Sequence, residues 1–335
     1  DPRIQLYRFD RNRGACAAMN KNIRLAKGEY IAVLNSDDMF LPEKLEKQVR
    51  FMDQHPNVSA VFGYAQVVDE DGNYFTNVDH FYHNIFKQSN RTRYEWLNHF
   101  FYKGNCLCHP SVLIRKKCYE DIGYYDQRLA QLPDLDFWVR LCLKYEIHII
   151  PEDLIKFRIR IEEANTSGDR PEVMRRSYYE HYQILKNYLK IERTDEFLKI
   201  FPEATIYGYP IEEDIIPFII AMIVLKQNNV SIVHKLFAIN ILFDLLSNKY
   251  MAEKLDKECG FRCTDFIKLT GEHDLFNLSE VLNLKQKIEE KDKQLIAKDT
   301  DLIEKERLLI ENNKQYQELL KSSWKWRLTN NLKHY

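Results

Sequence analysis

Two aspartates stand together directly after a short apolar run. Residues 30–34 (YIAVL) are followed by Asn35, Ser36, Asp37 and Asp38. Such a run predicts a strand that is buried on both faces of a parallel sheet, with the acids at its carboxyl end. Asp37 and Asp38 would offer the hard oxygen ligands that Mg²⁺ or Mn²⁺ prefer. The same residue types are typical of a solvated turn or a helix N-cap, so this loop alone leaves both interpretations open.

A second pair of aspartates, Asp134 and Asp136, opens an aromatic segment at residues 137–140 (FWVR). A carboxylate within hydrogen-bond reach of a hydroxyl group can take its proton as that oxygen attacks another atom. Aspartates at a helix start also cap the helix and interact favourably with its dipole. Both interpretations stay open for Asp136, and for Asp134 until its context is considered.

Two further segments carry polar groups that could face an anionic ligand. Residues 12–14 (NRG) form a turn before a predicted helix, where backbone N–H groups and Arg13 could bind a diphosphate. Residues 104–111 (GNCLCHPS) lie between the two acidic sites and include Cys106, Cys108 and His109. Their spacing excludes a structural zinc site, because no second ligand pair follows at a suitable distance.

These segments, taken in order, resemble the large family of inverting nucleotide-sugar glycosyltransferases with the GT-A fold. The resemblance rests on residues 12–14 with Ala18 and Asn20, on residues 26–38 and on residues 42–48. It covers about residues 3–190. It implies a Rossmann-like α/β domain with a mixed sheet, a nucleotide-sugar donor, and a glycan or lipid-linked acceptor in the synthesis of bacterial surface polysaccharide.

The resemblance also implies roles for the acidic loop. It would be a DXD-type motif in which Asp37 holds the metal on the donor diphosphate, with Asp38 beside it. Asn35 replaces the first acid of that motif. Its amide can still hydrogen-bond a ribose hydroxyl, but it brings no charge to the cation.

For the second acidic site the resemblance implies that Asp134 is the catalytic base, although Pro133 stands where the family often has Glu. Asp136 would belong to the nucleotide-sugar site. Residues 104–111 would line the donor and acceptor cleft, with Asn105 in the donor site and His109 against phosphate or acceptor.

A loop after the predicted catalytic region resembles the family's flexible loop over the donor phosphate. It contains Arg158, Arg160 and residues 165–168 (NTSG). An ordinary linker has the same composition. The family also has strands before the position of Asp1, so we expect an N-terminal piece of the nucleotide pocket to be missing.

The surrounding pattern predicts the elements that position these residues. We expect a helix at residues 14–26 ended by a left-handed Gly28, and a helix opened by Pro42 that buries a face at Leu45, Val49 and Met52. Strands are predicted at residues 58–68 and 147–150, with a turn at residues 71–72 between the first of these and residues 74–75. Residues 170–246 read as helical.

From residue 281 onward the chain is rich in Lys, Glu, Gln, Asp and Leu, and apolar residues recur every seven positions. That pattern predicts a long helix, but the second heptad column is mostly polar. A weak coiled coil that permits self-association and a solvated single helix both stay open. The repeating residues are Val281, Ile288, Leu295, Leu302, Leu309 and Tyr316.

Bulk composition excludes several classes of protein. Lys plus Arg is 49 against 50 Asp plus Glu, so a net charge of -1 gives no global attraction for nucleic acid. The most apolar run, residues 215–225, is shorter than the ~18 residues that a membrane span needs. Seven scattered cysteines, with Cys259 and Cys263 at helical spacing, indicate reduced thiols in a cytosolic protein, attached at most to the inner face of a membrane.

The sequence therefore predicts a metal-dependent GT-A glycosyltransferase in which Asp37 and Asp134 meet in one cleft. Two rivals stay open: a sugar nucleotidyltransferase, and a non-catalytic scaffold with a degenerate enzyme domain. We expect a GT-A domain at residues 1–168 that lacks its N-terminal nucleotide-binding strands, and a helical region at 169–277. A coiled-coil-like helix at 278–321 and an aromatic, basic tail at 322–335 would follow.

Overall fold

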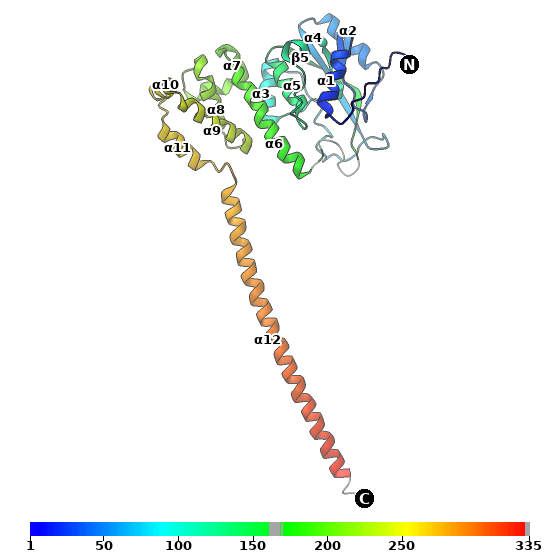
Figure 1. Ribbon diagram of the computed structural model, residues 1–335, viewed down its shortest axis with the longest axis vertical. Coiled ribbons are helices and arrows are strands. Elements are labelled where there is room, and N and C mark those ends of the chain that lie inside the picture. The colour runs from blue at the N-terminus through cyan, green and yellow to red at the C-terminus, as the bar shows by residue number, and fades with distance from the viewer. Residues whose placement is uncertain (161–167, 169, 332–335) are drawn as a thin grey trace. The chain divides into compact units, whose positions relative to one another are not determined.

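In the computed structural model, the structure describes residues 1–160, 168 and 170–331, and side chains up to residue 324 (Figure 1). Contacts within the chain divide it into two units, Asp1–His273 and Asp274–Tyr335. The first unit contains the sheet and most of the helices, and the second contains one long helix.

The described residues of the first unit form a five-stranded mixed sheet in the order β1-β4-β3-β5-β2. The long central strands β3 and β5 run parallel, and the other three pairings are antiparallel. The predicted α/β domain with a mixed sheet is therefore confirmed. The strands are β1 (Tyr30–Ala32), β2 (Met39–Phe40), β3 (Val58–Val68), β4 (Leu113–Arg115) and β5 (Glu146–Arg158).

The strand predicted at residues 30–34 exists, but its predicted environment is wrong. Strand β1 ends at Ala32 and pairs antiparallel with β4, at one edge of the sheet that the described residues form. Ile31 is buried, whereas Leu34 is 49% exposed. An apolar run indicates a strand, but it does not tell which strand pairs with it or whether the pairing is parallel. The strand predicted at residues 147–150 is part of the longer β5.

Helices pack beside this sheet, namely α1 (Ala15–Leu25), α2 (Lys44–Gln54), α3 (Arg93–Lys103), α4 (Lys116–Ile122) and α5 (Pro133–Cys142). The predicted first helix is confirmed, but its end is not as expected. It closes at Ala26, whose φ of -60° is not left-handed, and Gly28 is not among the residues with positive φ.

Helix α2 begins two residues after Pro42, and its buried face differs from the predicted one. Met52 is buried as expected, but Leu45 is 45% exposed. The buried positions on this helix are Lys44, Gln48 and Met52. Hydropathy alone misplaced the face, because two polar side chains find hydrogen-bond partners inside the domain.

The helical region predicted from residue 170 is confirmed and continues to residue 272. In Figure 1, helices α7 to α11 gather at the end of the first unit that lies away from α1, α2 and α4. Helix α8 is apolar all round and almost wholly buried, as expected for the core of a helical layer. The helices are α6 (Pro171–Leu185), α7 (Thr194–Ile200), α8 (Ile216–Lys226), α9 (Ile232–Ser247), α10 (Lys249–Cys259) and α11 (Cys263–Glu272).

The second unit confirms the predicted long helix, α12 (Leu278–Asn331). Its heptad residues are exposed, from 43% at Val281 to 73% at Leu309. Self-association through a coiled coil stays a prediction. None of the helices in the described part of the chain combines the length and apolar character required to cross a bilayer.

Candidate functional site

The acidic loop connects β1 with β2, and Asp38 is fixed inside it. Asp38 is 7% exposed. One carboxylate oxygen accepts the Arg158 backbone N–H at 3.0 Å, and the other accepts the Asn35 side-chain amide at 3.0 Å. Burial raises the pKa of Asp38 to about 6, against the opposing effect of these two hydrogen bonds. Of the two predicted metal ligands, Asp38 therefore already has both carboxylate oxygens hydrogen-bonded within the protein.

Arg158, at the end of β5, holds the loop from the other side. Its Nε donates to the carbonyl oxygen of Asp37 at 2.9 Å. Its Nη1 donates to the carbonyl oxygens of Asp69 and Glu70 in the turn after β3. Arg158 thus ties the acidic loop to that turn through backbone groups, which fixes the position of Asp37.

The Asp37 carboxylate is in a different state from its neighbour. It is half-buried and makes no hydrogen bond or ion pair with the described residues. No group of three or more His, Cys, Asp or Glu within residues 1–160, 168 and 170–331 is arranged to hold a metal ion. Mg²⁺ commonly binds one or two protein carboxylates plus substrate phosphates, and one uncommitted carboxylate fits that pattern.

Asp134 lies in the first turn of α5, and it is half-buried. Its Oδ2 accepts the Asn105 side-chain amide at 2.6 Å, and its Oδ1 accepts the Leu135 backbone N–H at 2.9 Å. Asn105 follows Gly104, which ends α3 with a φ of 76°. Burial raises the pKa of Asp134, while His109 and these hydrogen bonds act in the opposite direction. The structure therefore brings three predicted site residues together.

His109 completes this group. Its Nε2 lies 2.8 Å from the Tyr125 hydroxyl, and its ring packs against Tyr125 and Trp138. Asn20 of α1 fixes the Tyr125 backbone through two hydrogen bonds, at 2.8 and 3.1 Å. Burial lowers the pKa of His109, and the charge of Asp134 opposes that shift. A neutral imidazole beside a carboxylate can accept or donate a hydrogen bond to a ligand.

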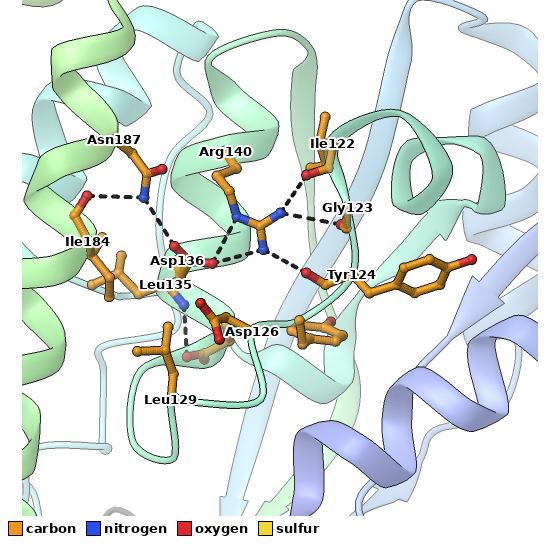
Figure 2. Close-up of polar contacts among 12 residues, drawn as sticks. Ile122, Gly123, Tyr124, Asp126, Leu129, Leu135, Asp136, Arg140, Ile184 and Asn187 are labelled. Carbon is orange, nitrogen blue, oxygen red and sulfur yellow. Dashed lines mark hydrogen bonds and ion pairs between the residues drawn. The ribbon is translucent and has the colours of Figure 1, made fainter.

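Asp136, which was predicted in the nucleotide-sugar site, is hydrogen-bonded to side chains of the fold. Figure 2 shows its carboxylate between Arg140 and Asn187. Arg140 bonds it through Nε at 2.8 Å and Nη2 at 2.8 Å, and Asn187 donates to it at 3.0 Å. Arg140 also donates to the carbonyl oxygens of residues 122–124, at the end of α4 and directly after it. These contacts account for Asp136 without a ligand, so we leave it out of the proposed ligand set.

The two acidic sites face a common buried thiol. Cys108 is 2% exposed, and burial raises its pKa well above the usual value. The charges of Asp38 and Asp134 both add to that rise. Carboxylates from loops about a hundred positions apart therefore both influence the pKa of one buried thiol. That Asp37 and Asp134 meet in one cleft stays a prediction.

Other predicted site residues lie apart from the two acidic sites or outside the described residues. Arg13 is exposed, and it pairs with Asp10 at 3.0 Å and with the Phe9 ring. Among the residues that the structure describes, no hydrogen bond or ion pair joins Arg13 to either acidic site. Arg160 is exposed, and Asn165, Thr166 and Ser167 of the predicted closing loop lie outside the described residues.

A cavity of about 620 Å³ lies beside α3. Its lining contains none of the predicted site residues, so it does not define the site. The lining includes Arg91, His99, Tyr102, Lys103, Lys199 and Glu203.

Two buried charged residues near the site were missed by sequence reasoning. Lys44, 1% exposed, donates to Gln48 at 2.7 Å and lies over the Phe40 ring, and burial lowers its pKa to about 7. Glu180 of α6 is also 1% exposed and hydrogen-bonds the backbone before α5. The sequence did contain a signal for Lys44, because it is spaced four residues from Gln48 and eight from Met52, as on one face of a helix.

Sequence comparison gives a family for the first part of the chain. Residues 1–122 match the family model described as glycosyl transferase family 2. An uncharacterized glycosyltransferase of Methanocaldococcus jannaschii is 30% identical over 187 residues, which is 55% of this chain and 59% of that protein. A putative teichuronic acid biosynthesis glycosyltransferase of Bacillus subtilis, TuaG, is 39% identical over 83 residues, 25% of this chain and 31% of that protein.

Structural comparison gives distant likenesses. The crystal structure of S. aureus TarS 1–349 in complex with UDP-GlcNAc has a TM-score of 0.42 and 18% identity, covering 72% of this chain and 64% of that one. The mannosyltransferase PcManGT from Pyrobaculum calidifontis, in complex with GDP-Man and Mn²⁺, has a TM-score of 0.34 and 13% identity, covering 78% and 66%.

The sequence matches cover most of the segments on which the predicted resemblance rests. The family model ends at residue 122, so it includes the acidic loop and Asn105, whereas Asp134 lies beyond it. The M. jannaschii match is longer, at 187 residues. The chain spans about six tenths of that relative and about half or less of several others. Residues 1–122 of this chain are therefore similar to glycosyl transferase family 2, and the relatives that match over a longer stretch are glycosyltransferases by name.

Proposed function

We propose that this chain transfers a sugar from a nucleoside-diphosphate sugar to an acceptor hydroxyl, with inversion at the anomeric carbon. The observation that carries the proposal is the environment of Asp134. Its carboxylate is half-buried and oriented by Asn105, and its pKa is raised by burial. A base is most effective when its pKa approaches the working pH, so this shift favours proton transfer.

Asp134 would take the proton of the acceptor hydroxyl as its oxygen attacks the anomeric carbon. The nucleoside diphosphate would leave from the opposite face, so the configuration inverts. Asn105 would hold Asp134 in place during this step, and His109, kept neutral by burial, would hydrogen-bond the donor phosphate or the acceptor. We keep Asp134 as catalytic base, with Asn105 and His109 as contacts of the sugar nucleotide.

Asp37 is the residue that we propose as metal ligand, with Mn²⁺ or Mg²⁺ as the ion. When bound, the ion would offset the charge that develops on the departing diphosphate. Asp38 would support the loop through Arg158 rather than compete for the ion, since both of its oxygens are engaged. Asn35 would also serve the loop, because its amide already donates to Asp38.

We further propose an acceptor in surface glycan synthesis, namely a glycan or a lipid-linked saccharide. Support comes from the match to TuaG, whose description names teichuronic acid biosynthesis. A cytoplasmic location, at most peripheral to the inner face of a membrane, and self-association through α12 are further parts of this proposal.

A donor screen tests the function. Nucleoside-diphosphate sugars, UDP-GlcNAc and GDP-mannose among them, would be incubated with the full chain and Mn²⁺, and the released nucleoside diphosphate would be measured. We expect release with at least one donor, loss of release with EDTA, and a fall of about a hundredfold in Asp37→Ala. Ser36→Ala, on the exposed part of the same loop, is the matched control and should keep wild-type turnover.

Two further experiments could contradict the proposal. Formation of a nucleotide sugar from a sugar 1-phosphate and a nucleoside triphosphate would identify a nucleotidyltransferase. Absence of any metal-dependent binding of UDP or GDP by calorimetry would identify a scaffold. Normal turnover in Asp37→Ala would remove that residue from the metal site.

A further inference from the structure

Glu180, in the middle of α6, has a carboxylate surrounded by backbone N–H groups. One oxygen accepts from Ala130 at 2.7 Å, and the other accepts from Gln131 at 2.8 Å and Leu132 at 2.8 Å. The residue is 1% exposed. No Lys, Arg or His of the described chain lies within ion-pair distance of it. Within the described chain, Glu180 is therefore a buried acid whose hydrogen-bond partners are backbone N–H groups.

This arrangement constrains the backbone that it touches. Burying an ionised carboxylate is very unfavourable unless hydrogen-bond donors replace the lost water. Here the three donors belong to three consecutive residues, so any displacement of that segment would leave a buried charge without its partners. The segment 130–132 is thus held in one position by an element that lies later in the chain.

The constrained segment leads directly into the catalytic turn. Leu132 is the N-cap of α5, and Asp134 is the second residue of that helix. N–H groups at a helix start have no partner within the helix and attract negative charge. Glu180 satisfies the donors just ahead of α5, while Asp134 bonds the Leu135 N–H inside the first turn.

The charges of both carboxylates reach one nearby buried thiol. Cys16 is buried, and its thiol donates to the Leu129 carbonyl oxygen at 3.4 Å. Burial raises the pKa of Cys16 to about 11, and the charges of Glu180 and Asp134 both add to that rise. Asn187, just beyond α6, makes a second connection by donating to Asp136 at 3.0 Å. The start of α5 is therefore held from the α6 side at two points.

We propose that Glu180 is a positioning residue that fixes the direction of the Asp134 carboxylate toward the acceptor hydroxyl, acting through the backbone of residues 130–132. This inference rests on the proposed function for the role of Asp134. The anchoring itself depends only on the hydrogen bonds and burial of Glu180. Helix α6 would then be part of the catalytic apparatus, although its sequence contains no catalytic motif.

The test is Glu180→Gln in the full chain, because the amide keeps the size but turns an NH₂ group toward backbone donors. Hydrogen exchange of a peptide spanning residues 129–136 should become about tenfold faster, because opening of this segment would cost less. The kcat should fall about 10- to 100-fold, as expected for a base displaced by a fraction of an ångström to 1 Å. The KM for the donor should stay within about twofold, because the acidic loop is not touched, and the pH profile of kcat should shift.

Glu172→Gln is the matched control, since it makes the same chemical change on the exposed first turn of α6. It should leave exchange, kcat and the pH profile at their wild-type values. If Glu180→Gln does not fold, Glu180→Asp replaces it, because the shorter side chain keeps the charge and reaches fewer of the three donors. A kcat at least fivefold below wild type in a folded Glu180→Asp would support the proposal by the same argument.

Two outcomes separate the parts of the proposal. A folded Glu180 variant with wild-type kcat and wild-type exchange at residues 129–136 would overturn the positioning role and leave the proposed function intact. If the wild-type chain transfers no sugar, the proposed function fails, and faster exchange in Glu180→Gln would still support the anchoring, while unchanged exchange would remove it too.

Discussion

Two pairs of aspartates can be compared, Asp37 with Asp38 and Asp134 with Asp136. In each pair the second acid is buried and engaged with the fold, at 7% and 8% exposure. The first acid of each pair is half-buried and less committed. With the described residues, the Asp37 carboxylate makes no hydrogen bond, and the Asp134 carboxylate makes two to other residues. Adjacent or nearly adjacent acids therefore divide into one that holds the backbone and one that is available for chemistry.

The pairs differ in how the buried acid is compensated. Asp136 has a guanidinium partner, Arg140, at 2.8 Å. Asp38 has only neutral donors on its oxygens, and burial raises its pKa to about 6. A buried acid beside a candidate site is thus not evidence of a ligand by itself. Asp136 and Asp38 differ in that the fold places a positive side chain against the carboxylate of Asp136, whereas neutral donors bind the carboxylate of Asp38.

The largest expected effect is a loss of activity on substitution of Asp134, the first of the two acids of α5. Asp134→Asn should lower kcat by about 10²- to 10⁴-fold, because the amide cannot accept the acceptor proton. Its melting temperature should stay near that of the wild type, since the amide oxygen can still accept the Leu135 N–H. The measurement is steady-state turnover with the donor identified in the screen. Turnover within a few fold of wild type would show that another group is the base.

Asp136→Ala tests the other half of this comparison by stability. The variant leaves Arg140 buried without its partner, which should cost about 3–5 kcal/mol in the free energy of unfolding. Chemical denaturation followed by circular dichroism measures this change. Arg140→Met combined with Asp136→Ala should recover part of the loss, because both charges are then removed. A stable Asp136→Ala that has lost donor binding would instead return Asp136 to the nucleotide-sugar site.

A smaller effect concerns Asp38 and pH. Its folded-state pKa of about 6 lies above the ordinary value of 3.8, so the folded chain binds more protons in that window. The stabilisation is therefore full below about pH 4 and is lost as pH rises through 6. Relative to Asp38→Asn, the wild type should lose about 2 kcal/mol of unfolding free energy between pH 4 and 7. Melting curves across this range measure the difference, and parallel curves would contradict the uncompensated state of Asp38.

The sequence was informative wherever function depends on short, local patterns. An apolar run followed by Asn35 to Asp38 located a strand and its acidic loop, and the spacing of residues 26–48 indicated the family that the comparisons then matched. Periodicity also located α1, the helical region and α12. These features depend on neighbours within one or two turns of the chain, so a linear pattern contains them.

Sequence patterns failed where a residue's role depends on what packs against it. The buried face of α2 was misplaced because Gln48 donates to the carbonyl oxygens of Val61 and Ser111, which are remote in sequence. The partners of Asp136, namely Arg140 and Asn187, were likewise not visible in the sequence, which placed this acid in the nucleotide-sugar site. Hydropathy ranks both residue types as surface-seeking, and only long-range hydrogen bonds reverse that ranking.

By itself the sequence determined the order of elements, the two acidic segments and the resemblance to a glycosyltransferase family. Tertiary structure alone decided that Asp38 and Asp134 act on one buried thiol, that Arg158 fixes the acidic loop, and that Glu180 holds the backbone ahead of the proposed base. The physical reason is that local pattern records the preferences of a segment for helix, strand or turn. Whether a buried charge is compensated is set by groups that come close only when the chain has folded.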